Sequence, residues 1–161
     1  MFDLQEIEAI KRLKYKYMRC LDNKLWGEME DCFAEDATCS YSGGKFAFSG
    51  RKAILDFFRE SMDAAHILSS HTVHHPEIDI TSETTATGIW RLEDVYIDDK
   101  EGFAIQGTAW YRDEYVKLDG AWKLQHTGYK RTWEEMVVRK GDERLSMLQR
   151  WSDKTGASSG V

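Results

Sequence analysis

The chain has 161 residues, of which 42% are hydrophobic and 12% aromatic, and its formal net charge is −6. This length and composition can bury a substantial core, so we expect one folded domain over residues 1–152 and a flexible tail over residues 153–161. The acidic residues are dispersed and no basic stripe is present. The charge pattern therefore argues against binding to nucleic acid or to an anionic membrane surface.

The first residues of the chain and its cysteines indicate in which cellular compartment the protein is expected. The first six residues are acidic and lack an apolar signal core, and no apolar run approaches the ~18 residues of a membrane span. The cysteines Cys20, Cys32 and Cys39 are odd in number and form no Cys-x-x-Cys pair. They are typical of small buried side chains in a reducing compartment. We therefore expect a soluble, cytoplasmic protein.

The N-terminal segment has the periodicity of an amphipathic helix. The pattern predicts a helix from Asp3 to about Leu21, with Ile10, Leu13, Tyr17 and Leu21 on its buried side. The buried hydroxyl of Tyr17 then needs a hydrogen-bond partner. Asp22 closes this helix at an end whose partial negative charge disfavours an acid, so we expect another contact to hold it there.

The next segment predicts two short helices separated by a hairpin. The first begins at Trp26 and ends near Ala34. Ala37–Tyr41 and Lys45–Phe48 flank Gly43-Gly44, which is typical of a hairpin turn. Ser49 is the expected N-cap of the second helix, whose apolar positions are Ile54, Phe57, Phe58 and Met62.

After His66 the pattern changes to long strands. We expect four of them, at His71–Ile80, Thr85–Ile97, Phe103–Val116 and Ala121–Trp133, followed by a short helix over residues 144–151. Interior glycines at 88, 107 and 128 indicate a strongly curved sheet. Helices followed by a mostly antiparallel sheet belong to the α+β class. A bent sheet closed by the N-terminal helices forms a cone-shaped barrel whose apolar interior suits a small, mostly apolar ligand.

One strand places a carboxylate among apolar side chains. Alternation along Thr87–Tyr96 puts Trp90, Leu92 and Asp94 on the same face. A carboxylate there is costly to ionise unless it is hydrogen-bonded or takes part in chemistry. The sequence leaves two interpretations open: a strand-end aspartate that reaches water, or a carboxylate of a functional site.

Three histidines lie close together in His71-Thr72-Val73-His74-His75. On a strand, His71 and His75 face one way and His74 the other, and no sulfur ligand has a zinc-like spacing, so we expect no metal site. Asp22 paired with His71 is the alternative. A carboxylate bound to one imidazole nitrogen fixes the tautomer and makes the other nitrogen a better proton acceptor. Arg131 either stabilises an oxyanion, pairs with a pocket carboxylate or lies on the surface.

Three segments carry a resemblance to a known family. Residues 15–22, 71–78 and 84–94 resemble the SnoaL-like branch of the nuclear transport factor 2-like superfamily, and its bacterial bile-acid 7-alpha-dehydratases in particular. The resemblance covers about residues 5–135 and implies helices packed into a cone-shaped sheet. It also implies a catalytic set formed by Tyr17, Asp22, His71, Asp94 and Arg131.

The resemblance implies a cofactor-independent lyase that eliminates water from a hydrophobic, steroid- or bile-acid-like oxo substrate. His71, oriented by Asp22, is the expected base, while the electrophilic roles stay undistributed among Tyr17, Asp94 and Arg131. The alternatives are a double-bond isomerase, a dehydrohalogenase or a non-catalytic ligand-binding protein. We also expect a homo-oligomer, because a curved sheet leaves its convex face to be covered. The resemblance favours a trimer over a dimer.

Overall fold

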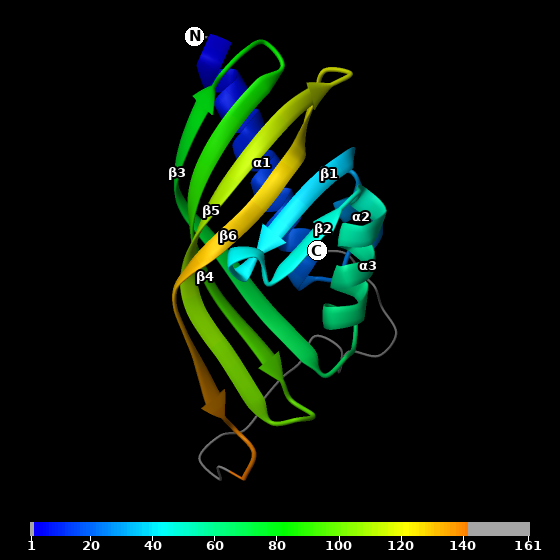
Figure 1. Cartoon of the computed structure of the whole chain (residues 1–161), viewed down its shortest axis with the longest axis vertical. Helices are drawn as coiled ribbons and strands as arrows, with labels where there is room; N and C mark the ends of the chain where they lie inside the picture. The colour runs from blue at the N-terminus through cyan, green and yellow to red at the C-terminus, as the bar shows by residue number, and fades with distance from the viewer. Residues whose placement is uncertain (1, 142–161) are drawn as a thin grey trace.

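The computed structural model describes residues 2–141, which form three α-helices and six strands (Figure 1). The elements in chain order are α1 (Phe2–Asp22), α2 (Trp26–Glu30), β1 (Phe33–Tyr41), β2 (Phe46–Ser49), α3 (Arg51–Met62), β3 (Ile67–Ile80), β4 (Thr85–Asp98), β5 (Phe103–Leu118) and β6 (Ala121–Val138), with a 3-10 turn at Ser42–Gly44. The helix predicted over 144–151 and the tail over 153–161 lie outside the described residues.

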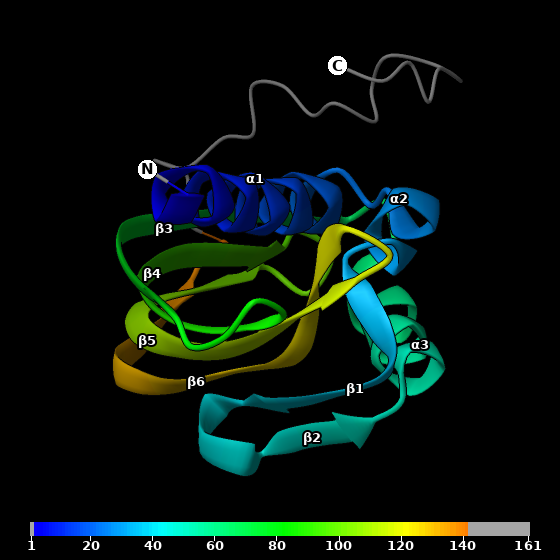
Figure 2. The same cartoon turned by 90° about the horizontal axis from the view of Figure 1, so that it is seen from above.

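The six strands form one sheet in the order β2-β1-β6-β5-β4-β3. The β1–β6 pair is parallel and the other pairs are antiparallel. Figure 2 shows the sheet curling so that α1 lies along one side of the curl, while α2 and α3 cover one end. The α+β class and the curled, cone-like sheet are confirmed, although the sheet is not closed into a barrel. None of the helices in residues 2–141 combines the length and the apolar character that a membrane crossing requires.

Two helix boundaries differ from the prediction. The second helix ends at Glu30, and Phe33 already belongs to β1. Ser49 is not an N-cap, because it pairs with Thr38 as the last residue of β2. Gly50 is the N-cap residue of α3 instead, with a φ of +90° and no side-chain cap. The sharp turn from strand to helix requires a positive φ, which glycine adopts with little strain.

Glycine and bulges produce the bend of the sheet. The β5–β6 register shifts between Thr108 and Ala109 and again between Glu114 and Tyr115. A Cβ on Gly128 would lie 2.5 Å from the carbonyl oxygen of Ser40, so the parallel pairing of β1 with β6 requires a residue without a side chain. Bulges increase local twist, so these register shifts contribute to the bend, whereas Gly128 allows the close approach of β1.

The buried stripe of α1 differs by one position from the predicted stripe. Ile10, Tyr17 and Leu21 are buried as expected, but Leu13 is only half-buried and Lys14 is fully buried. The charged Lys14 thus occupies the buried position that the periodicity predicted for Leu13. The three cysteines are buried and unpaired, as predicted.

Candidate active site

A carboxylate and an imidazole meet where α1 ends against β3. Oδ1 of Asp22 lies 2.7 Å from Nδ1 of His71, and Oδ2 accepts a hydrogen bond of 2.8 Å from the backbone N–H of His71. The hydroxyl of Ser69 donates to Oδ1 at 2.8 Å. Three donors, rather than helix capping, therefore fix the position of the Asp22 carboxylate. The predicted pairing of Asp22 with His71 is present in the structure.

The imidazole of His71 is oriented for proton acceptance. Its side chain is 13% exposed, and Nε2 has no hydrogen-bond partner among residues 2–141. Because Nδ1 faces a carboxylate, the hydrogen-bond network assigns the proton to Nδ1. The lone pair is then on Nε2, where it can accept a proton.

Asp94 lies beside His71 on the concave face. The two residues are direct partners in the β3–β4 register, so their side chains project from the same face of adjacent strands. Trp90, Leu92 and Asp94 are all buried, as the alternation predicted. The side chain of Asp94 is only 6% exposed, so it is a carboxylate of the interior rather than a strand-end residue in water.

Arg131 of β6 neutralises Asp94 through a bidentate pair. Its Nη1 donates to one carboxylate oxygen and its Nη2 donates to the other at 2.9 Å. Burial is the largest single effect and lowers the pKa of the Arg131 guanidinium, but the hydrogen bond to Asp94 and the charges of the neighbouring acidic groups together outweigh it, and the pKa is raised. Glu134 approaches Nε at 2.8 Å, yet at an angle that leaves the buried Nε without a hydrogen bond. Arg131 thus serves a site carboxylate and is not a surface charge.

A glycine makes this pair possible. Arg131 is opposite Ala109, whereas Asp94 is opposite Gly107, so the guanidinium has to cross the strand between them. An added Cβ on Gly107 would lie 3.4 Å from Nη1 of Arg131 and only 2.5 Å from the carbonyl oxygen of Trp133. The missing side chain at position 107 therefore provides the space through which Arg131 reaches Asp94.

Gly107→Ala is expected to lower the melting temperature and to weaken the Arg131–Asp94 pair. A contact of 2.5 Å with backbone forces the strands apart, and overpacking of this kind destabilises by about 1–3 kcal/mol. In a protein of this size, this corresponds to a loss of roughly 2–12 °C. Thermal melts check this expectation, with Gly27→Ala in α2 as the control because its added Cβ meets nothing within 4 Å. Equal melting temperatures for the two variants would contradict the proposed role of Gly107.

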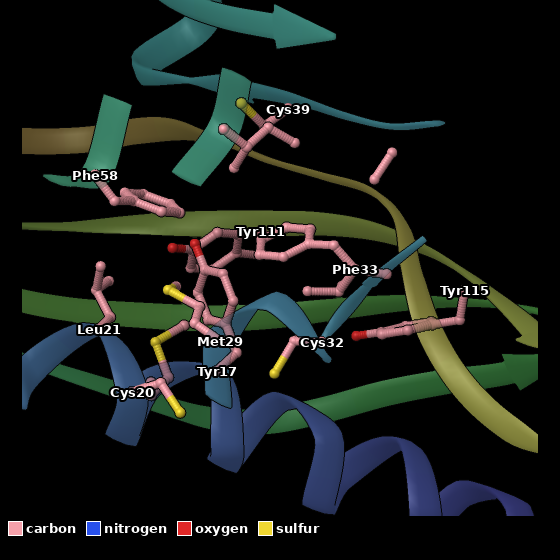
Figure 3. Packing of buried hydrophobic residues seen from close by; sticks show 14 of the residues in the cluster. Tyr17, Cys20, Leu21, Met29, Cys32, Phe33, Cys39, Phe58, Tyr111 and Tyr115 are labelled. Atoms are coloured by element: carbon pink, nitrogen blue, oxygen red, sulfur yellow. The ribbon is translucent and has the colours of Figure 1, made fainter. Parts of the chain in front are cut away.

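Tyr17 lies deeper in the interior than the other four predicted residues. Its hydroxyl is 3.0 Å from that of Tyr41, and Figure 3 shows Tyr17 and Tyr111 projecting towards one another from α1 and β5. Burial, followed by the proximity of Tyr41, raises the pKa of Tyr17 well above its ordinary value. Tyr41 stacks obliquely on Tyr129 with 5.6 Å between centroids, and the guanidinium of Arg131 lies 4.9 Å from the Tyr129 ring. Tyr17 is thus connected to Arg131 through Tyr41 and Tyr129.

A second buried ion pair was not predicted. Nζ of Lys14 lies 2.8 Å from Oδ2 of Asp113, and neither side chain is exposed. Alternation along β5 contained the signal for Asp113, because it places this acid on the same face as Ala109, Tyr111 and Tyr115. This is the pattern that singled out Asp94. No comparable signal exists for Lys14, which resembles an ordinary polar position of an amphipathic helix.

The remaining histidines do not join the site. His75 is exposed and has a φ of +47° at a bulge in β3, while His74 lies 3.9 Å from Glu93. Nδ1 of His126 contacts the hydroxyl of Thr38 at 2.7 Å. In the described part of the chain, no three His, Cys, Asp or Glu side chains converge as metal ligands do.

Three hollows on the described surface lie away from the Asp22–His71 pair. One, of about 1090 Å³, runs between α1 and the β5–β6 turn, and two others of about 440 and 430 Å³ lie on the sheet. None of these three is lined by His71, Asp22 or Tyr17. Tyr17, Tyr41 and Tyr111 are packed against one another, so a ligand that reaches them has to displace side chains.

Comparison with known proteins gives the same architecture. A family model described as the SnoaL-like domain matches residues 3–128. A structure from Novosphingobium aromaticivorans DSM 12444, provisionally named a scytalone dehydratase, is 27% identical with a TM-score of 0.76. The match covers 91% of this chain and 100% of that one.

Two more distant structures show the fold alone. One is the hexachlorocyclohexane dehydrochlorinase LinA-type3 from Novosphingobium barchaimii LL02, 18% identical with a TM-score of 0.73, over 84% of this chain and 92% of that one. The other is a protein of unknown function with a cystatin-like fold from Nostoc punctiforme PCC 73102. It is 17% identical with a TM-score of 0.60, over 76% of this chain and 88% of that one.

Proposed function

Because the chain belongs to the SnoaL-like domain family, and because its site holds an oriented histidine base, we propose that it is a lyase. The proposed reaction is cofactor-independent elimination of water from a hydrophobic, steroid- or bile-acid-like oxo substrate. The observation that carries the proposal is the placement of the Asp22–His71 dyad beside the Arg131-bound Asp94. A ligand carrier has no evident need for two such charged pairs. The similarity to a structure provisionally named a dehydratase supports the same reaction class.

The proposed reaction begins with proton transfer to Nε2 of His71. The proton comes from a carbon made acidic by conjugation to the ketone, and the C–H electron pair moves into an extended enolate. Asp22 stabilises the imidazolium that forms, since its carboxylate receives the Nδ1–H. The enolate then collapses, the C–O bond breaks with its electron pair, and the leaving hydroxide takes a proton and departs as water.

In the proposed reaction, the hydrogen bonds of Asp94 argue against this residue as the acid for the leaving group. Both oxygens of Asp94 accept hydrogen bonds from Arg131, so this carboxylate has no proton to give. His71 carries the abstracted proton and can return it to a hydroxide that leaves from the same face. The raised pKa of Tyr17 keeps its hydroxyl protonated, which suits a hydrogen-bond donor to the enolate oxygen.

The purified protein is expected to remove water from one or more members of a panel of 3-oxo steroids and bile-acid thioesters that carry a hydroxyl group. Mass spectrometry of each incubation measures the loss of one water from the substrate. His71→Gln, which cannot act as the base, is the matched control. An unchanged panel, or equal conversion by wild type and His71→Gln, would count against the dehydratase.

The ion pair of Asp94 with Arg131 also favours a second candidate function. A reaction that needs no acid for the leaving group, such as double-bond isomerisation or loss of chloride, can use the same base. The fold similarity to a dehydrochlorinase is compatible with this alternative. The same panel separates the two, because isomerisation conserves the mass and dehydrochlorination releases chloride that can be measured directly.

A further inference from the structure

The interior of the protein contains a charged network that the proposed chemistry does not use. Lys14 of α1 and Asp113 of β5 are in contact at 2.8 Å. Thr127 donates to Oδ1 of Asp113 at 2.7 Å, and Tyr115 donates to Oδ2 at 2.8 Å. Trp90 in turn donates to the Tyr115 hydroxyl at 2.9 Å. The carboxylate is thus saturated with donors, and the network offers no open position for a ligand.

Desolvating a pair of charges is costly, and an apolar pair of similar volume is often as stable or more stable. A fully buried lysine therefore raises the question of what its charge does. Burial lowers the pKa of Lys14, although the neighbouring Asp113 counteracts this effect. The contact of 2.8 Å with a carboxylate favours the charged ammonium.

The ammonium lies against two tyrosine rings. Nζ of Lys14 is 3.5 Å from the ring centroid of Tyr111 and 4.8 Å from that of Tyr17. A cation at the face of an aromatic ring is attracted by its electrons. The ammonium, which is the charge in contact with these rings, favours negative charge on the phenol oxygens. The Asp113 carboxylate opposes it and contributes to the raised pKa of both tyrosines.

We propose that Lys14, held by Asp113, is a positioning residue that strengthens the hydrogen bonds given by the Tyr17 hydroxyl and its tyrosine neighbours to an anion in the interior. This inference rests on the proposed function, because the enolate is the anion concerned. At 1.5 Å per residue, Tyr17 lies about 7.5 Å from Asp22 along the helix axis. The base and the tyrosines are therefore separated by about the size of a small ring system. Lys14 lies about 4.5 Å further along the same axis.

The test uses double variants because single ones leave an unpaired buried charge. Lys14→Met alone is expected to melt at a much lower temperature than wild type, since Asp113 then lacks its partner. Lys14→Met/Asp113→Asn and Lys14→Met/Asp113→Leu remove both charges and should regain most of the melting temperature. A merely structural pair would regain function together with stability.

The probe is 4-nitrophenol, whose anion absorbs visible light and whose single ring can present an oxyanion to Tyr17. Titration of the wild type with 4-nitrophenol at a series of pH values gives the dissociation constant of the anion. In the double variants we expect binding of the anion to be roughly tenfold weaker, within the range of a desolvated cation–π contact. Binding of neutral phenol should change little.

Two further variants make the result decisive. Lys11→Met removes a half-buried cation from the same helix and should bind the anion as wild type does. Tyr17→Phe should weaken binding of the anion. Wild-type affinity in the folded double variants would overturn the proposal. It would also be overturned if Tyr17→Phe bound the anion as wild type does, or if the wild type did not bind the anion. Failure of both double variants to fold would assign the pair to folding instead. Since the probe undergoes no elimination, these outcomes are independent of whether a dehydratase substrate is found.

Discussion

His71→Ala, Asp22→Asn and the double variant are expected to share nearly the same low activity. A positioned general base contributes about 10²–10⁴-fold to the rate, so His71→Ala should lose at least about 10²-fold. If Asp22 acts through His71, removing it from the His71→Ala variant changes little further. The two side chains are 2.7 Å apart, which makes this strong coupling reasonable.

The asparagine variant acts through the tautomer of the imidazole. Asp22 faces the backbone N–H and Nδ1 of His71 and the hydroxyl of Ser69. An asparagine oxygen can accept from the backbone N–H, but its amide then donates to Nδ1. The proton of the neutral imidazole moves to Nε2, which can no longer accept one from the substrate.

Turnover of the substrate identified in the panel, measured beside thermal melts, checks this expectation. Ser69→Ala is the matched control, since it removes one hydrogen bond to Asp22 and leaves the contact with Nδ1 in place. It should lose some stability and little rate. Independent and multiplicative rate losses for His71→Ala and Asp22→Asn would show that the two residues do not act as a unit.

The free energy of unfolding is expected to fall steeply above pH 10. Burial raises the pKa of four tyrosines well above the ordinary value of 10.0, namely Tyr17, Tyr41, Tyr111 and Tyr115. These hydroxyls ionise near pH 10 in the unfolded chain but stay protonated in the folded one. The unfolded state then binds fewer protons, so stability decreases as pH rises.

The four tyrosines together give a large slope. Each contributes about 1.4 kcal/mol per pH unit, or about 5 kcal/mol per pH unit in total once the pH is well above 10. Burial also raises the pKa of Cys32 from 9.0 to about 12, which adds a smaller loss that begins near pH 9. Lys14 has the opposite sign, because its lowered pKa increases stability with pH up to about 10.5, where the unfolded lysine deprotonates.

A typical stability of 5–15 kcal/mol would therefore be lost within about one to three pH units above pH 10. Denaturant melts at a series of pH values measure the slope. Tyr17→Phe removes one of the four hydroxyls and should make the slope less steep by about 1.4 kcal/mol per pH unit. A stability that stays constant from pH 9 to 12 would show that these tyrosines are not protected in the folded state.

Local patterns were sufficient to predict much of the site. The helix that ends at Asp22 and the strand face that includes Asp94 both follow from periodicity, which depends on backbone geometry alone. The pairing of Asp22 with His71 was a hypothesis from chemistry, and the structure brings the two together. That these residues perform catalysis stays a prediction.

Strand register, strand pairing and contacts between distant segments could not be predicted from local sequence patterns. The face of Arg131 depends on a register shift near Thr108, and a bulge of one residue reverses every side chain beyond it. The parallel pairing of β1 with β6 joins segments about 90 residues apart, which no local pattern specifies. Lys14 was missed because only its contact with Asp113, on a distant strand, makes its burial tolerable.

Helix α1 carries Lys14, Tyr17 and Asp22 within nine consecutive residues. A helix behaves as a rod with about 100° of rotation per residue, so an insertion or deletion between these positions would turn one of them out of the interior. Divergence along this segment is therefore restricted to substitutions at constant length. New substrate preferences can arise more readily from the strands opposite, where each inward side chain can change without moving the next.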